Sequence, residues 1–154
     1  IIGISRNFTK TQLEHKAKSN FHNFKILNID LLNKQEVHNF LTKVKPSIVF
    51  NLSGPSSVYE SLRNHKLENE IKIIFNNLTD SLVENRNFCN FFQASSSEMY
   101  GLNNKEEQYT EKSSFIPNSP YANAKLINHN KVKELHKIYD WLVPSRDNWS
   151  VLLH

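Results

Sequence analysis

Tyr121 and Lys125 lie four residues apart in a segment whose pattern predicts a helix, so both side chains project from one face of it. A lysine ammonium beside a phenol favours the phenolate and lowers a tyrosine pKa that is near 10 when unperturbed. The pair could therefore act as a base at neutral pH. Because lysine is abundant in this chain, a solvent-exposed tyrosine and lysine with no chemical role is the alternative.

A second group of reactive side chains follows a predicted strand over residues 88–95. Residues 95–97 are serines, and Glu98 adds a carboxylate. In parallel α/β sheets ligands bind at the carboxyl ends of the strands, so a site is expected here. A carboxylate in such a site could transfer protons. The alternative for Glu98 is a loop carboxylate that accepts a hydrogen bond from a backbone amide.

These two segments carry a family resemblance. Residues 94–101 read ASSSEMYG, and residues 117–125 read PNSPYANAK. They resemble the motifs A-S-[ST]-S-E-[LM]-Y-G and P-x-S-P-Y-A-x-A-K of the extended short-chain dehydrogenase/reductases that act on nucleotide sugars. Within that group the similarity is greatest to the GDP-mannose 4,6-dehydratase family. It extends through residues 30–31 and 46–53 and covers roughly residues 1–141.

The resemblance implies roles for four catalytic residues. Tyr121, assisted by Lys125, would remove the proton from the sugar 4-hydroxyl while a hydride leaves C4 for a nicotinamide. Ser96 would hydrogen-bond the same oxygen and stabilise the charge that develops there. Glu98 would take the C5 proton and protonate the departing 6-hydroxyl. Return of the hydride to C6 would convert GDP-mannose into a 4-keto-6-deoxy sugar with no net consumption of cofactor.

Glu98 favours elimination over simple epimerisation. Epimerases of the same superfamily need the serine, tyrosine and lysine but no carboxylate at this position. A nucleotide-sugar 4-epimerase, or another 4,6-dehydratase of the same fold, is the alternative. A different class of protein would be a non-catalytic Rossmann-fold binding protein, but the presence of all four catalytic residue types argues against it.

The end of the first predicted strand favours NADP over NAD. Rossmann sites that prefer NAD carry an acidic residue at the end of their second strand for the ribose 2′-hydroxyl. The first predicted strand of this chain stands in that place, and it ends in Ser5, Arg6 and Asn7 with no acid. A guanidinium suits a 2′-phosphate; the alternative is that Arg6 only begins a basic loop. The resemblance adds residues beside the adenine and near the nicotinamide ribose and pyrophosphate. The expected cofactor residues are Arg6, Asp30, Leu31, Leu52, Ser53, Gly54, Ser56, Tyr121 and Lys125.

Short apolar segments alternate with helical patterns and would position these residues. This alternation indicates βαβ units, and hence an α/β, doubly wound, Rossmann-like parallel sheet. The strand over 47–53 is apolar on both sides, so we expect it to be buried on both faces. The predicted strands cover residues 1–5, 25–29, 47–53 and 88–95, and the predicted helices run from Asn33 to just before Pro46, from 66 to 84 and from 120 to 137.

The resemblance also defines what we expect at the chain ends. The chain opens on an apolar, strand-like segment, and the family's first strand and Gly-x-x-Gly-x-x-Gly phosphate turn would precede Ile1. We therefore expect a partial NAD(P)-binding Rossmann domain over residues 1–141, without that strand or the C-terminal substrate domain, and a divergent tail over 142–154. Without the phosphate turn this chain should bind cofactor feebly. In the predicted helix over residues 66–84, Phe75 and Asn76 replace a small Gly-Thr pair of the family. We therefore expect this helix to pack differently against the sheet.

Composition excludes several classes of protein. Three glycines in 154 residues exclude collagen-like and glycine-rich sequences, and a single cysteine excludes an internal disulfide framework. The cysteine count favours a reducing compartment, so a cytoplasmic location is expected. No apolar run approaches the roughly 20 residues of a membrane span, and no metal site is expected.

The basic charge does not indicate a nucleic-acid partner. The net charge is +4 and the isoelectric point about 9.1. A basic cluster lies in a polar stretch without helical apolar spacing, which is typical of a solvated loop. The expected partners are GDP-mannose or a related nucleotide sugar and, by resemblance, further copies of the chain. The cluster comprises Lys10, His15, Lys16, Lys18, His22 and Lys25.

Overall fold

The computed structural model describes residues 1–6, 23–54, 58–64, 66–101, 109–110 and 112–139. Ser56, most of the basic cluster and the tail over 142–154 lie outside these residues.

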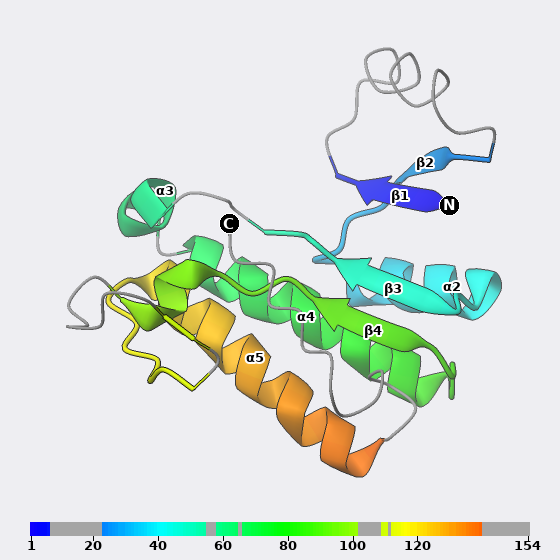
Figure 1. The fold of residues 1–154 in the computed structure, drawn as a ribbon. Coiled ribbons are helices and arrows are strands. Elements are labelled where there is room, and N and C mark those ends of the chain that lie inside the picture. The colour runs from blue at the N-terminus through cyan, green and yellow to red at the C-terminus, as the bar shows by residue number, and fades with distance from the viewer. Residues whose placement is uncertain (7–22, 55–57, 65, 102–108, 111, 140–154) are drawn as a thin grey trace.

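The described residues follow the predicted alternation of strands and helices (Figure 1). Two elements were not predicted, because the six-residue α3 is too short to show an apolar period and η1 is a single 3₁₀ turn. The elements are β1 (Ile2–Ser5), β2 (Lys25–Asn28), α2 (Lys34–Val44), β3 (Ile48–Asn51), α3 (Val58–Arg63), α4 (Lys66–Glu84), β4 (Asn90–Gln93), η1 (Ser97–Tyr100) and α5 (Pro120–Ile138).

The helix starts follow the capping chemistry in the sequence. The Asn33 side chain accepts hydrogen bonds from the backbone N–H groups of Gln35 and Glu36 at the start of α2. Ser119 does the same for Ala122 at the start of α5, where Pro120 occupies the first turn. These side chains satisfy N–H groups that have no partner inside the helix.

The strands form two parallel pairs. Ile2 of β1 is in register with Lys25 of β2, and Ile48 of β3 with Asn90 of β4. The α/β class with parallel strands is therefore confirmed. Among the described residues the two pairs are not hydrogen-bonded to each other. The Rossmann order 3-2-1-4-5-6 contains the neighbouring parallel pairs 3-2 and 4-5, and the two pairs observed here agree with that order.

The core lies on one face of β3 and β4, where α4 packs between α2 and α5 (Figure 1). Phe75 of α4 is only 1% exposed and makes an edge-to-face contact with Phe91 of β4, with ring centroids 6.0 Å apart. Phe75, which is larger than the residue of the family's Gly-Thr pair that it replaces, thus fills the core. Buried members of this core are Val37, Leu41, Ile74, Phe75, Leu78, Leu82, Cys89, Phe91 and Val132.

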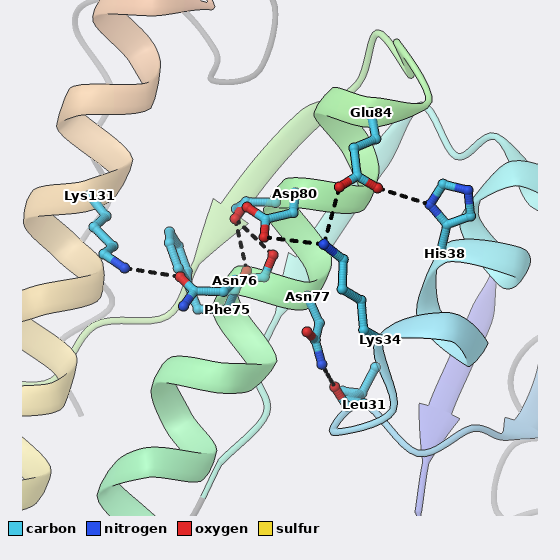
Figure 2. A network of polar contacts seen from close by, with 10 residues as sticks. Leu31, Lys34, His38, Phe75, Asn76, Asn77, Asp80, Glu84 and Lys131 are labelled. Atoms are coloured by element: carbon cyan, nitrogen blue, oxygen red, sulfur yellow. Dashed lines mark hydrogen bonds and ion pairs between the residues drawn. The ribbon is translucent and has the colours of Figure 1, made fainter.

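Polar contacts join α4 to its neighbours (Figure 2). The Asn76 side-chain oxygen accepts a hydrogen bond from Lys131 of α5 at 3.0 Å. On the other side Lys34 of α2 pairs with Glu84 at 3.1 Å, and His38 lies 3.3 Å from the same carboxylate. The Phe75–Asn76 pair is therefore accommodated, one residue in the core and one bridging two helices.

The outer face of β3 corrects one prediction. Ile48 is 53% and Phe50 64% exposed, so the strand is not buried on both faces. Its core-facing neighbour Val49 packs against the cluster beneath the sheet, and Phe50 contacts Phe92 of β4 at 5.5 Å between ring centroids. The described helices cover the Val49 face and leave the other face open.

Cys89 is buried, and its burial raises the thiol pKa to about 11. It therefore behaves as a small apolar side chain. Within the described part of the chain no helix is long and apolar enough to cross a membrane. The same residues contain no group of three or more histidine, cysteine or acidic side chains that could hold a metal ion.

Candidate cofactor and catalytic site

A cavity of about 430 Å³ opens at the carboxyl ends of β1, β2 and β3. This is the position where parallel α/β sheets bind their ligands, and the volume falls in the usual range of small-molecule sites. Five of the predicted cofactor residues line it. The lining residues are Ile4, Ser5, Arg6, Ile29, Asp30, Leu31, Ser53, Gly54, Leu67, Glu70 and Ile74.

The loop after β2 is held by its own side chains. The Asp30 carboxylate accepts a hydrogen bond from the Leu32 N–H at 3.0 Å, and the Asp30 N–H donates to Glu36 of α2 at 3.0 Å. The Leu31 carbonyl accepts a hydrogen bond from Asn77 of α4 at 2.9 Å (Figure 2). These bonds fix Asp30 and Leu31 at the cavity wall.

The loop after β3 is held by a buried amide. Asn51 donates to Gln93 of β4 at 2.8 Å, and its oxygen accepts hydrogen bonds from both the N–H and the hydroxyl of Ser53. Gly54 then has φ +118°, a conformation that favours glycine. Leu52 is mostly exposed. The cavity lining does not include Leu52, Tyr121 or Lys125, so the structure does not bring these three together with the five predicted cofactor residues that line it.

Arg6 lies at the end of β1, as its expected role requires, but it already has a partner. Its Nη2 atom is 3.3 Å from Oε2 of Glu70, which projects from α4 into the same cavity. Sequence reasoning missed Glu70, because residues 64 positions apart show no local pattern that pairs them.

Tyr121 and Lys125 are both buried on α5, so the solvent-exposed alternative is wrong. Lys125 is 5% exposed, and its Nζ atom lies 5.7 Å from the centroid of the Tyr121 ring. The same atom donates a hydrogen bond at 3.3 Å to the carbonyl oxygen of Ala94, the residue that follows β4. Burial lowers the pKa of Lys125. A cation is thus held beside the phenol at the carboxyl end of a strand.

Glu98 lies in the turn η1, which packs against α5, and Ser96 is the residue that precedes this turn. The Ser96 hydroxyl caps this turn by accepting a hydrogen bond from the Glu98 N–H at 3.3 Å. Glu98 itself is half-buried. Within the described residues no hydrogen bond joins either side chain to Tyr121 or Lys125, and no backbone amide donates to the Glu98 carboxylate. The η1 segment with Ser96 and Glu98 and the helix α5 with Tyr121 and Lys125 therefore meet by packing and through the hydrogen bond from Lys125 to the Ala94 carbonyl.

His129 is a buried residue of this region that the predictions omitted. Its Nδ1 atom lies 3.3 Å from the Ser95 hydroxyl, and its ring packs edge-on against Phe115. Burial, with a smaller effect of the Lys133 charge, lowers the His129 pKa to about 4. The signal was available, since His129 continues the four-residue spacing of Tyr121 and Lys125 on one helix face.

The parallel strands, with helices packed against them and a cavity at their carboxyl ends, define a protein of the Rossmann-fold class. Solved structures confirm the fold. UDP-glucose 4-epimerase from Bifidobacterium longum, in complex with NAD⁺ and UDP, superimposes with a TM-score of 0.79 at 18% identity over 90% of this chain and 42% of that one. RMD from Pseudomonas aeruginosa, complexed with NADPH, gives 0.71 at 21% identity over 92% and 50% of the two chains.

The sequence itself places the chain within this class. The profile of the family described as GDP-mannose 4,6 dehydratase matches residues 1–145, and the chain belongs to that family. GDP-mannose 4,6-dehydratase of Vibrio cholerae serotype O1 is 32% identical in an alignment of 136 positions that covers 80% of this chain and 35% of that protein. The chain therefore spans about a third of the length of this curated relative. The family resemblance drawn from the two motifs is confirmed.

Proposed function

We propose that this chain forms the cofactor-binding and catalytic part of an enzyme that converts GDP-mannose into GDP-4-keto-6-deoxymannose. The observation that carries the proposal is the buried Tyr121–Lys125 pair, bound through the Ala94 carbonyl to the strand end that leads into Ser96 and Glu98. Membership of the GDP-mannose 4,6-dehydratase family supports the substrate and the reaction.

The family depends on a nicotinamide cofactor, and we propose NADP. The cavity at the strand ends supports a site for the adenosine end of such a molecule, because apolar walls from Leu31 and Leu67 accompany the guanidinium of Arg6 and the carboxylate of Asp30. A bound nicotinamide would supply the hydride chemistry of the reaction, oxidation at the sugar C4 and reduction at C6. Arg6 would supply the charge that a 2′-phosphate requires.

Tyr121 would remove the proton of the sugar 4-hydroxyl. Lys125 supports this role because its ammonium lies 5.7 Å from the phenol ring in a buried setting, where charges act more strongly than in water. The Ala94 carbonyl orients the ammonium. Ser96 would donate a hydrogen bond to the same sugar oxygen.

Glu98 would carry out the elimination. Once C4 is a ketone, the C5 proton is acidic, and a carboxylate can remove it and then protonate the leaving 6-hydroxyl. Glu98 is only half-buried in η1, which supports this role. The predicted roles of Ser96, Glu98, Tyr121 and Lys125 are proposals that the following experiment tests.

The experiment compares Glu98→Gln with the wild type in the whole protein supplied with GDP-mannose and NADP. The wild type should form a 4-keto-6-deoxy product with no net change in reduced cofactor. The variant should lose at least about a hundredfold in product formation, while reduced cofactor still accumulates from C4 oxidation. Glu134→Gln, a matched change on the exposed face of α5, should behave as the wild type. Conversion to a C4 epimer without loss of water would refute the dehydratase and support the 4-epimerase alternative.

A further inference from the structure

We propose that Glu70 sets how far this chain discriminates NADP from NAD, by competing with the cofactor 2′-phosphate for Arg6. The inference rests on the proposed function, since it requires that the cavity at the strand ends takes the adenosine part of the cofactor.

The pair bridges the cavity from two elements. Arg6 extends from the end of β1 and Glu70 from the second turn of α4, with 3.3 Å between Nη2 and Oε2. Leu67 precedes Glu70 by three residues on the same helix face and also lines the cavity. The charge of Glu70 is thus part of the site and not of the outer surface of the helix.

The two charges favour different cofactors. A guanidinium binds a phosphate through paired, charge-assisted hydrogen bonds. The Glu70 carboxylate already satisfies that guanidinium, and it would repel a 2′-phosphate placed beside Arg6. A ribose 2′-hydroxyl is neutral and can donate a hydrogen bond to a carboxylate. Glu70 therefore supplies, from α4, a carboxylate like the one that NAD-preferring Rossmann sites carry at the end of their second strand.

The pair is exposed enough to exchange partners. The Arg6 side chain is 48% and the Glu70 side chain 27% exposed, and ion pairs with this much solvent contact are weak. A dianionic phosphate can displace Glu70 at a small cost. We therefore expect the wild-type chain to prefer the 2′-phosphate only modestly, and removal of the Glu70 charge to sharpen that preference.

The test measures nucleotide binding and needs no turnover. Adenosine 2′,5′-bisphosphate and adenosine 5′-monophosphate, which differ only in the 2′-phosphate, are titrated at up to millimolar concentration into the 154-residue chain. Amide NMR shifts of the cavity residues report binding. Glu70→Gln removes the charge at constant size. Glu68→Gln is the matched control, because Glu68 lies on the same helix, pairs with Lys72 at 2.7 Å and is not among the cavity-lining residues.

Glu70→Gln should bind the bisphosphate about fivefold to tenfold more tightly, with less than about a twofold change for the monophosphate. Glu68→Gln should match the wild type. Arg6→Ala should abolish the difference in affinity between the two nucleotides, both in the wild-type chain and in the Glu70→Gln variant. If both nucleotides shift the cavity residues but Glu70→Gln equals Glu68→Gln, the competition is refuted while the cavity keeps its assignment. If neither nucleotide shifts these residues in any variant, the cavity assignment fails, and the inference fails with it.

Discussion

The buried neutral His129 should make the stability of this fold depend on pH. Its pKa is lowered to about 4 by burial and by the Lys133 charge, whereas an unperturbed histidine titrates near 6.5. Below pH 6.5 the unfolded chain therefore binds a proton that the folded chain does not bind until near pH 4. The stabilisation is complete above about pH 6.5 and is lost as the pH falls toward the folded pKa.

The size of the effect follows from the two pKa values. A shift of this extent corresponds to about 3 kcal/mol in total, of which about 2 kcal/mol should be lost between pH 7 and pH 5. This is a large part of the 5–15 kcal/mol that typically separates folded from unfolded domains. Urea unfolding followed by circular dichroism at both pH values measures it directly.

Two variants separate the titration of His129 from a general loss of stability. His129→Gln should remove most of the pH dependence, because no proton is taken up on unfolding. Val132→Ala deletes buried volume three residues further along α5, so it should lower the free energy of unfolding equally at both pH values. If His129→Gln keeps the full wild-type pH dependence, the assignment of the effect to this histidine is refuted.

Two further predictions concern packing. Phe75→Ala should lower the free energy of unfolding by about 3–5 kcal/mol, because it empties a core site that is 1% exposed. Ile138→Ala, at a site 68% exposed, should change it by less than about 0.5 kcal/mol in the same urea titration. The second prediction concerns two glycines. Gly101→Ala should lower the free energy of unfolding by about 2 kcal/mol or more, since φ is +74° and an added Cβ would overlap the Ile116 carbonyl oxygen. Gly3→Ala should lower the free energy of unfolding clearly less, because the added Cβ would meet side-chain atoms of Phe24 at 3.1 Å and of Ile26 at 3.5 Å and no backbone atom at closer range; equal losses at the two glycines would contradict this reasoning.

Local chemistry made most of the fold predictable. Helices with an apolar stripe and a capping side chain, such as those that begin after Asn33 and Ser119, lie where the pattern placed them. The short element α3 has no such pattern and was missed. Burial of the outer face of β3 was also predicted wrongly, because apolar side chains at Ile48 and Phe50 show only that a cover would be favourable and not which segment supplies it.

The sequence by itself determined the family, through two motifs in which residue types and spacing are both restricted by the chemistry. It also identified the parallel α/β class and placed Arg6 at a strand end. Only the tertiary structure decided the electrostatic surroundings of these groups. It buried Lys125 against the Ala94 carbonyl and brought Glu70 to Arg6 from 64 residues away. The physical reason is that burial and ion pairing depend on distances between elements, and these are set by packing and not by spacing along the chain.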